Sequence, residues 1–227
     1  MRTVVVGDVH GCRRELEALL SLARFSPGQD RLVFVGDLVV RGPEPHEVLA
    51  LVSRLGAQAV RGNHESRLLA VRGREGSSEH EQLAAELSED EWKSIEAMPL
   101  WVDLPEHGIR VVHAGLVPGQ SVDETPAETL LTIRSIDESG RPSASRGRGA
   151  PWGERYMGPP HVLFGHNALE EPQLHPWATG IDTGCVYGGR LTAVVLHENE
   201  PMPRGRDALA VLASVPAFRA YVRRAAG

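Results

Sequence analysis

Short apolar runs in this sequence repeatedly end in an acidic, amide or imidazole side chain beside glycine or alanine. The segments that end this way are Gly7-Asp8-Val9-His10-Gly11, Gly36-Asp37, Gly62-Asn63-His64-Glu65, His113-Ala114-Gly115 and Gly165-His166-Asn167. One such segment alone would indicate only a turn. Five of them, each after a predicted strand, indicate polar groups gathered at one edge of a sheet, where open α/β sheets bind ligands.

The donor atoms in these segments suit a metal centre. The relevant side chains supply only oxygen and nitrogen, and they are Asp8, His10, Asp37, Asn63, His113 and His166. This set fits Mn, Fe or Zn ions rather than a structural thiolate site. Six ligands are too many for one catalytic ion that keeps a position open, but they fit two ions about 3.5–4 Å apart that share a carboxylate. Such a pair would hold a phosphoryl group for in-line attack.

Alternating strand and helix patterns are expected to position the first three segments. Apolar runs predict strands over 3–6, 32–35 and 57–60, and the spacing of apolar residues predicts helices over 12–24, 44–55 and 64–72. This β-α-β-α-β-α order predicts a parallel sheet with helices on its faces.

The rest of the chain mixes strands with polar segments. We expect two short helices over 77–97 that form a cap, a hairpin of strands 100–104 and 109–112, a mobile loop over 141–149, strands over 161–165, 178–182 and 191–197, and a helical tail over 207–227. No internal repeat or clear boundary interrupts the sequence. We therefore expect a single domain over residues 1–227.

Composition narrows the class of protein. The 227 residues are 41% hydrophobic, which is enough for a substantial core. A net charge of −6 makes nucleic acid an unfavourable partner, and only two cysteines are present, too few for a disulfide framework. The sequence has neither a signal-peptide pattern nor an apolar stretch near the roughly 20 residues of a membrane helix. We expect a cytoplasmic protein without a membrane partner.

Taken in order, the five segments resemble the metallophosphoesterase superfamily, in the branch shared by Ser/Thr phosphoprotein phosphatases and ApaH-type symmetrical diadenosine tetraphosphatases. The resemblance runs from residue 3 to about 196. It implies an α/β fold of the metallophosphoesterase type, a β-sandwich of two mixed sheets flanked by helices. It also implies a cofactor of two divalent metal ions, most often Mn²⁺, with Fe, Zn or Co as alternatives.

The resemblance also implies a role for each matching residue. Asp8, His10 and Asp37 would hold the first metal, and Asp37, Asn63, His113 and His166 the second, with Asp37 bridging. His64 matches the histidine that protonates the leaving oxygen. Arg41 matches a phosphate-binding arginine, and Arg134 matches a second one; a guanidinium can bind two phosphate oxygens in parallel.

Residue 40 bears on the substrate. Phosphoprotein phosphatases usually carry Asp at this position and ApaH-type hydrolases a small apolar residue, and this chain has Val40. The similarity therefore favours symmetrical cleavage of diadenosine tetraphosphate and related dinucleoside polyphosphates to ADP, by attack of a metal-bound hydroxide. Glu65 instead matches the phosphatases, so the alternative is a small bacterial-type Ser/Thr/Tyr phosphoprotein phosphatase that hydrolyses phosphomonoesters. A non-catalytic phosphate-binding module would need a broken ligand set, and the expected ligands are all present.

Overall fold

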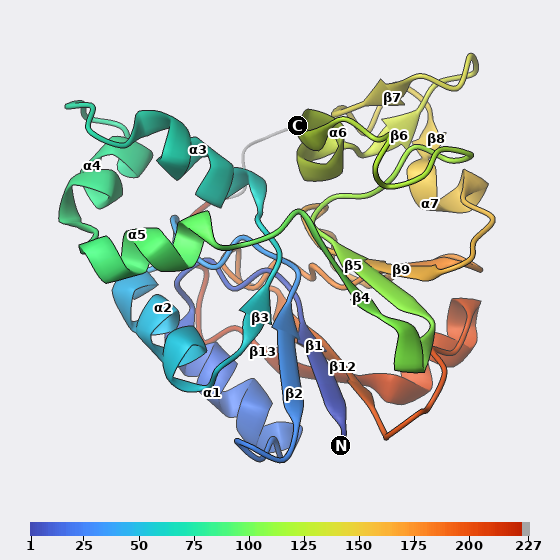
Figure 1. Ribbon diagram of the computed structural model, residues 1–227, viewed down its shortest axis with the longest axis horizontal. Coiled ribbons are helices and arrows are strands. Elements are labelled where there is room, and N and C mark those ends of the chain that lie inside the picture. The colour runs from blue at the N-terminus through green and yellow to red at the C-terminus, as the bar shows by residue number, and fades with distance from the viewer. Residues whose placement is uncertain (224–227) are drawn as a thin grey trace.

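The computed structural model describes residues 1–223 and is built on two five-stranded mixed sheets (Figure 1). The first sheet has the order β13 (Leu212–Pro216), β12 (Arg190–Leu196), β1 (Thr3–Val6), β2 (Arg31–Phe34) and β3 (Gln58–Ala59). The second has the order β10 (Gln173–Leu174), β11 (Ala178–Gly180), β9 (His161–Phe164), β5 (Ile109–Val112) and β4 (Trp101–Leu104). The expected sandwich of two mixed sheets is confirmed.

The predicted alternation of strands and helices is confirmed in the first third of the chain. Strand β1 pairs in parallel with β2, and β2 pairs in parallel with β3. Helices α1 (Arg13–Leu22) and α2 (Pro45–Arg54) connect these strands, and α3 (Asn63–Val71) follows β3. The apolar side of α1, which includes Leu16 and Leu19, is fully buried, so its amphipathic pattern packs the helix onto the sheet.

The second sheet repeats this arrangement with different connections. Strands β5, β9 and β11 run parallel to one another, while β4 and β5 form the predicted antiparallel hairpin. The hairpin turn contains the short helix η1 (Pro105–His107) and ends at Gly108, whose φ of +65° is the left-handed conformation that glycine adopts readily. Each sheet therefore contributes three parallel strands.

Three apolar clusters hold these layers together. The cluster between the two sheets includes Val5 and Val33 from the first sheet and Ile109 and Val111 from the second, all at most 1% exposed. A second cluster lies between the first sheet and its helices, and a third covers the outer face of the second sheet around Trp152. Burial on both faces explains why the central strands are short continuous apolar runs rather than alternating ones.

Two groups of short elements flank the upper ends of the parallel strands in Figure 1. One contains α3 with the two predicted helices of the 77–97 segment, α4 (Glu79–Glu86) and α5 (Glu89–Glu96). The other contains α6 (Ala127–Thr132), α7 (Trp152–Arg155) and a small sheet of β7 (Pro142–Ser143), β6 (Ser135–Ile136) and β8 (Ala150–Pro151). The sequence did not predict this second group, and part of the expected loop over 141–149 is strand β7.

The expected helical tail over 207–227 is wrong for most of its length. Residues Gly205–Val211 form the 3₁₀-helix η2, but Leu212–Pro216 is strand β13, which pairs antiparallel with β12 and covers the edge of the first sheet. Pairing satisfies the backbone groups that an uncovered edge would expose, and this outweighs the helical pattern. Residues 224–227 lie outside the described part of the chain. Within residues 1–223, no helix has the length and apolar content to cross a membrane.

Candidate metal centre and active site

The candidate site is built where the six parallel strands of the two sheets end. Each of these strands is followed within four residues by a polar side chain of the cluster: Asp8 after β1, Asp37 after β2, Asn63 after β3, His113 after β5, His166 after β9 and Asp182 after β11. Sequence reasoning found five of these positions and missed Asp182. The same pattern of an apolar run, an acid and a nearby glycine was present in Ile181-Asp182-Thr183-Gly184.

The backbone at these positions is held in an uncommon conformation. His10, Asp37 and His166 have φ values of 48°, 49° and 62°, in the left-handed region that few residues other than glycine adopt. Glycines allow the segments to approach closely: a Cβ at Gly62 would lie 2.2 Å from Oδ1 of Asp37, and a Cβ at Gly165 would lie 1.9 Å from Oδ1 of Asp8. Strain of this kind concentrates at functional sites because the surrounding structure imposes it.

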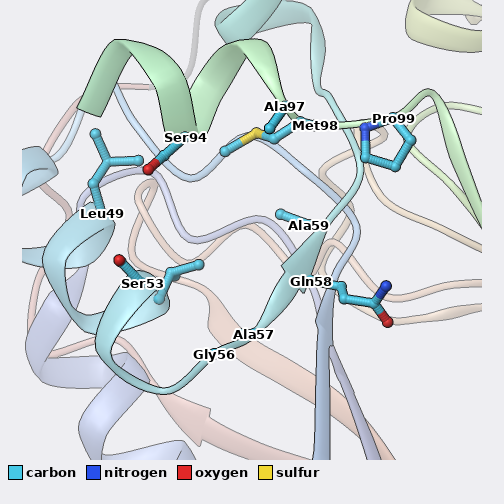
Figure 2. A pocket seen from close by; sticks show the side chains of 11 residues that line it. Leu49, Ser53, Gly56, Ala57, Gln58, Ala59, Ser94, Ala97, Met98 and Pro99 are labelled. Carbon is cyan, nitrogen blue, oxygen red and sulfur yellow. The ribbon is translucent and has the colours of Figure 1, made fainter. Parts of the chain in front are cut away.

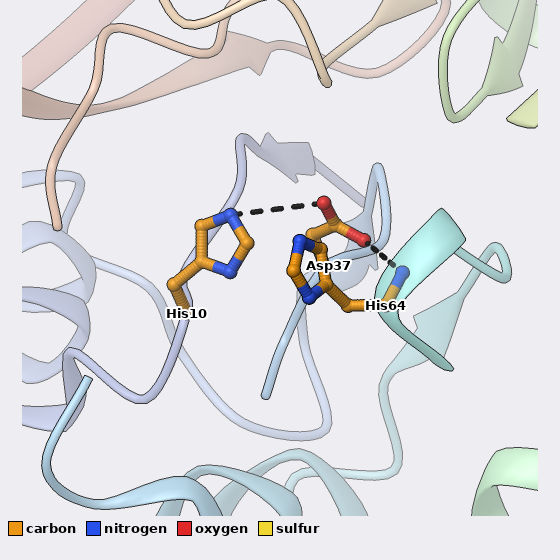
Figure 3. Close-up of side chains that lie close together, drawn as sticks. All are labelled: His10, Asp37 and His64. Carbon is orange, nitrogen blue, oxygen red and sulfur yellow. Dashed lines mark hydrogen bonds and ion pairs between the residues drawn. The ribbon is translucent and has the colours of Figure 1, made fainter. Parts of the chain in front are cut away.

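The carboxylate of Asp37 lies between His10 and the backbone nitrogen of His64, and dashed lines mark the two contacts (Figure 3). Nε2 of His10 lies 3.6 Å from Oδ2 of Asp37, and the backbone N–H of His64 donates a hydrogen bond to Oδ1 at 3.0 Å. These residues are at most 3% exposed, and their donor atoms lie close enough together for a metal ion, although the resemblance assigns His64 to proton transfer rather than to the metal.

A second group beside Asp37 consists of His113, Asn63 and His166, and we refer to the two groups, that of His10 with His64 and this one, as the two sides of Asp37. Nε2 of His113 is 3.4 Å from Oδ2 of Asp37, and the Oδ1 of Asn63 is 3.0 Å from Nε2 of His113 and 2.7 Å from Nδ1 of His166. Nδ1–H of His113 donates to the carbonyl of Val35 at 2.9 Å, which orients the ring so that Nε2 faces the oxygen atoms of Asp37 and Asn63. Asp37, His113 and His166 form a second group of donors with the spacing of a metal site.

Asp8 joins the cluster through the backbone N–H of His166, which lies 3.0 Å from its Oδ2. Burial, and then Asp182 and Asp37, raise the pKa of Asp8 well above its ordinary value. Burial also raises the pKa of Asp37, but His113, His64 and His10 outweigh it, so that pKa lies well below its usual range. Buried carboxylates that repel one another need cations to remain charged, so these residues fit divalent ions.

Glu65 organises the loops rather than lining the cluster. Its Oε2 accepts hydrogen bonds from the backbone N–H groups of Asp37 and Gly62, at 2.9 and 2.8 Å, and its Oε1 accepts one from Leu38 at 2.8 Å. Burial and the charge of Asp37 raise the pKa of Glu65 to about 7. This residue therefore joins the loop after β2 to the start of α3.

The two arginines implied by the resemblance contact different histidines of the cluster. Nη1–H of Arg41 donates to Nε2 of His10 at 3.2 Å, and Nε–H of Arg134 donates to Nε2 of His166 at 3.2 Å. The Arg41 guanidinium also lies 5.5 Å from the ring centre of Tyr187. Positive charge is therefore available at both ends of the cluster, where phosphate groups flanking it would be bound.

His64 has one ring nitrogen engaged and one available. Its Nδ1 lies 3.0 Å from Nε2 of His80, whereas its Nε2 is buried and has no hydrogen-bond partner within residues 1–223. Burial lowers the pKa of His64 to about 2, with His10, Arg41 and His80 acting in the same direction. A phosphate group beside Nε2 would oppose this shift, because negative charge favours the protonated ring. His80 lies outside the five segments that the sequence analysis identified.

An apolar cavity elsewhere in the molecule lacks the side chains of a catalytic site. A cavity of about 430 Å³ lies between α2, β3 and α5, and Figure 2 shows its lining, which includes Leu49, Ala59 and Met98. None of its lining residues is titratable. It therefore has no group to bind a metal or to transfer a proton.

The chain belongs to the calcineurin-like phosphoesterase family, whose model matches residues 1–201. This confirms the resemblance to metallophosphoesterases, and the chain is a hydrolase of that class. Proteins of the class use divalent metals, in agreement with the two groups of donors around Asp37.

Comparison with related proteins narrows the class of hydrolase further. The chain is 33% identical over 232 residues to bis(5′-nucleosyl)-tetraphosphatase PrpE (asymmetrical) of Halalkalibacterium halodurans, covering 88% of this chain and 92% of the relative. It is 30% identical over 254 residues to a symmetrical bis(5′-nucleosyl)-tetraphosphatase of Tolumonas auensis, covering 85% and 92%. A crystal structure provisionally described as a diadenosine tetraphosphatase is 37% identical, with a TM-score of 0.84 over 96% of this chain and 94% of its own.

Proposed function

We propose that this chain hydrolyses bis(5′-nucleosyl) tetraphosphates, with diadenosine tetraphosphate as the type substrate, symmetrically to two ADP. The observation that carries the proposal is a pair of arginines hydrogen-bonded to different histidines around Asp37, Arg41 to His10 and Arg134 to His166. A phosphorus inside a phosphate chain has phosphate groups on both sides. Two cationic groups at different histidines of the cluster would bind oxygens of the attacked phosphate and of its neighbours in the chain.

Space beside Arg41 supports a substrate larger than a single phosphate. A cavity of about 400 Å³ is lined by Arg41, Gly42 and Pro43 on one side and by Arg219, Ala220 and Tyr221 on the other. Its volume is within the range of small-ligand pockets. A nucleoside in this cavity would have its phosphates directed toward Arg41, so the cavity suits one half of a dinucleotide.

Each residue of the cluster would then have a separate task. Asp8, His10 and Asp37 would hold one divalent ion and Asp37, Asn63, His113 and His166 the other; we propose Mn²⁺ as the physiological metal. When bound, such ions supply positive charge for the phosphoryl group and lower the pKa of water. Arg41 and Arg134 would bind phosphate oxygens and offset the charge that develops in the transition state. His64, through Nε2, would give a proton to the leaving oxygen.

A product assay with Mn²⁺ tests the proposal. Purified chain is incubated with diadenosine tetraphosphate and the nucleotides are separated by anion exchange; we expect ADP alone. ATP with AMP would overturn symmetrical cleavage, and no turnover would overturn the substrate. A phosphoserine peptide assayed in parallel tests the alternative of a phosphoprotein phosphatase, which would release phosphate from the peptide and leave the dinucleotide intact.

A further inference from the structure

We propose that His80 is a positioning residue for His64: it accepts a hydrogen bond from the Nδ1–H of His64 and so directs Nε2 of that ring at the leaving oxygen of the substrate. The inference rests on the proposed phosphoryl-transfer role of His64, but not on the identity of the substrate. His80 belongs to the first turn of α4, in the segment that otherwise covers the outside of α3.

The geometry of the two rings is that of an oriented pair. Nδ1 of His64 and Nε2 of His80 are 3.0 Å apart, and the two rings are nearly parallel, with centroids 5.0 Å apart and an interplanar angle of 15°, as expected for an in-plane hydrogen bond between ring nitrogens. The opposite nitrogen of His64 is the one that is buried without a hydrogen-bond partner among the described residues. A ring held at Nδ1 with Nε2 left open has the arrangement that a histidine needs for proton transfer.

The helix that carries His80 is fixed at its start. Ser78 caps α4: its Oγ accepts from the N–H of Glu81 at 3.3 Å, and Oε2 of Glu81 accepts from the N–H of Ser78 at 3.0 Å. Glu79, beside His80, accepts a hydrogen bond from the backbone N–H of Arg41. The first turn of α4 therefore contacts both the loop that carries Arg41 and the ring of His64, and capping keeps it in place.

The partner at Nδ1 has to be an acceptor, and His80 can serve as one. Burial, and then Arg67, lower the pKa of His80, which keeps its ring neutral and its Nε2 lone pair available. With Nδ1–H directed at that lone pair, the mobile proton of a protonated His64 is the one on Nε2.

The proton transfer needs only two groups, His64 as the donor and the leaving oxygen as the acceptor. As the bond from phosphorus to the leaving oxygen breaks, its electron pair stays on that oxygen, which takes the proton from Nε2 of His64. His64 becomes neutral and keeps its Nδ1–H on His80. Protonation matters most when the leaving group is a strong base, so the contribution of His80 should depend on the leaving group.

The test compares two substitutions of His80 on two aryl phosphates with Mn²⁺ present. His80→Gln places an amide oxygen close to the position of Nε2, whereas His80→Phe keeps a planar aromatic ring and removes the acceptor. Phenyl phosphate releases a phenolate whose pKa is about 10, like that of tyrosine; p-nitrophenyl phosphate releases a much weaker base. Gln82→Ala, on the same helix and outside the site, is the matched control.

We expect His80→Phe to lower kcat for phenyl phosphate about 10- to 100-fold, a part of the 10²- to 10⁴-fold that general acids contribute. The same variant should lower kcat for p-nitrophenyl phosphate less than about threefold, and KM should change little. His80→Gln should recover most of the loss, and Gln82→Ala should match the unsubstituted chain on both substrates.

Equal losses of kcat on the two aryl phosphates, or no loss on either, would overturn the role of His80. So would equal activity of the Phe and Gln variants. Circular dichroism establishes that each variant is folded before assay, and the Gln variant keeps the comparison decisive if the Phe variant is unstable. If the unsubstituted chain cleaves aryl phosphates and not diadenosine tetraphosphate, the proposed substrate fails while the inference on His80 is still tested.

Discussion

The two sides of Asp37 hold their histidines differently. On the side of Asn63, His113 and His166, the ring nitrogens are engaged by backbone or side-chain groups, including the carbonyl of Val35 and the amide of Asn63. On the side of His10, the Nε2 of His64 is buried and has no hydrogen-bond partner in the part of the chain described. The first side is organised to hold a cation, whereas the second also leaves a group available for proton transfer.

This contrast follows from the elements that carry each side. Asn63 follows a strand of the first sheet, His113 and His166 follow strands of the second, and Asn63 lies within hydrogen-bond distance of both histidines. His64 and Arg41, in contrast, contact the first turn of α4, which lies outside the two sheets. A short helix can be placed by its cap and its packing without altering the sheets, so it can adjust proton transfer without disturbing the metal ligands.

Asp37→Asn should have the largest effect because Asp37 is shared by the two sides. The amide removes a negative charge from both groups of donors, so we expect bound metal to fall by at least half and kcat to fall by about 1,000-fold or more. Metal content by mass spectrometry and turnover of an aryl phosphate check both expectations. Retention of two ions with full turnover would contradict the proposal that Asp37 is shared by both groups of donors.

His113→Ala and His64→Ala should separate the two sides. His113→Ala removes a ligand, so we expect loss of metal together with loss of activity, part of which excess Mn²⁺ restores. His64→Ala should keep the metal and lower kcat by about 100-fold on substrates with basic leaving groups. The contrast would be refuted if the two variants lost metal equally.

Arg41→Ala and Arg134→Ala should have smaller and more similar effects. Each arginine reaches a histidine from its own side, so each should contribute to phosphate binding, and we expect kcat/KM for diadenosine tetraphosphate to fall about 10- to 100-fold in either variant. Lysine at either position should recover only part of the loss, because it cannot bind two oxygens in parallel. A loss confined to one arginine would argue against phosphate binding on both sides.

His161 is a buried histidine outside both groups of donors, and it serves as a reference for the effect of burial on the pH dependence of stability. Burial, and then Arg204, lower its pKa to about 4, below the value of about 6.5 expected in the unfolded chain. The unfolded chain therefore binds the extra proton first. The associated stability is present above pH 6.5 and should decline as the pH falls toward 4, by about 1.4 kcal/mol per pH unit. His161→Gln should flatten this decline in urea unfolding between pH 7 and 4.5; a slope identical to that of the unsubstituted chain would contradict it.

Much of the site was predictable because its residues follow a rule of β-sheets. An apolar run followed by Asp, Asn or His and glycine marked five of the six strand ends, and the parallel order of β1, β2 and β3 brought three of them together. Asp182 was missed although it obeys the same rule. His80 was not predictable, since its relation to His64 depends on where a capped helix lies in space.

Other features depend on tertiary contacts that no local pattern contains. The strand at Leu212–Pro216 exists because β12 offers an unpaired edge, which overrides a helical pattern in the tail. Cys12 and Cys185, far apart in sequence, come together in the core with Glu15. Local patterns gave the strands that end at the site, and long-range pairing decided what surrounds them.

The central claim is that two divalent ions are held around Asp37 by ligands from both sheets. Anomalous diffraction from crystals grown with Mn²⁺ tests it most directly. The account predicts two peaks about 3.5–4 Å apart, one beside His10 and the other beside His113, with the carboxylate of Asp37 between them. A single peak away from Asp37, or no peak among these side chains, would contradict it.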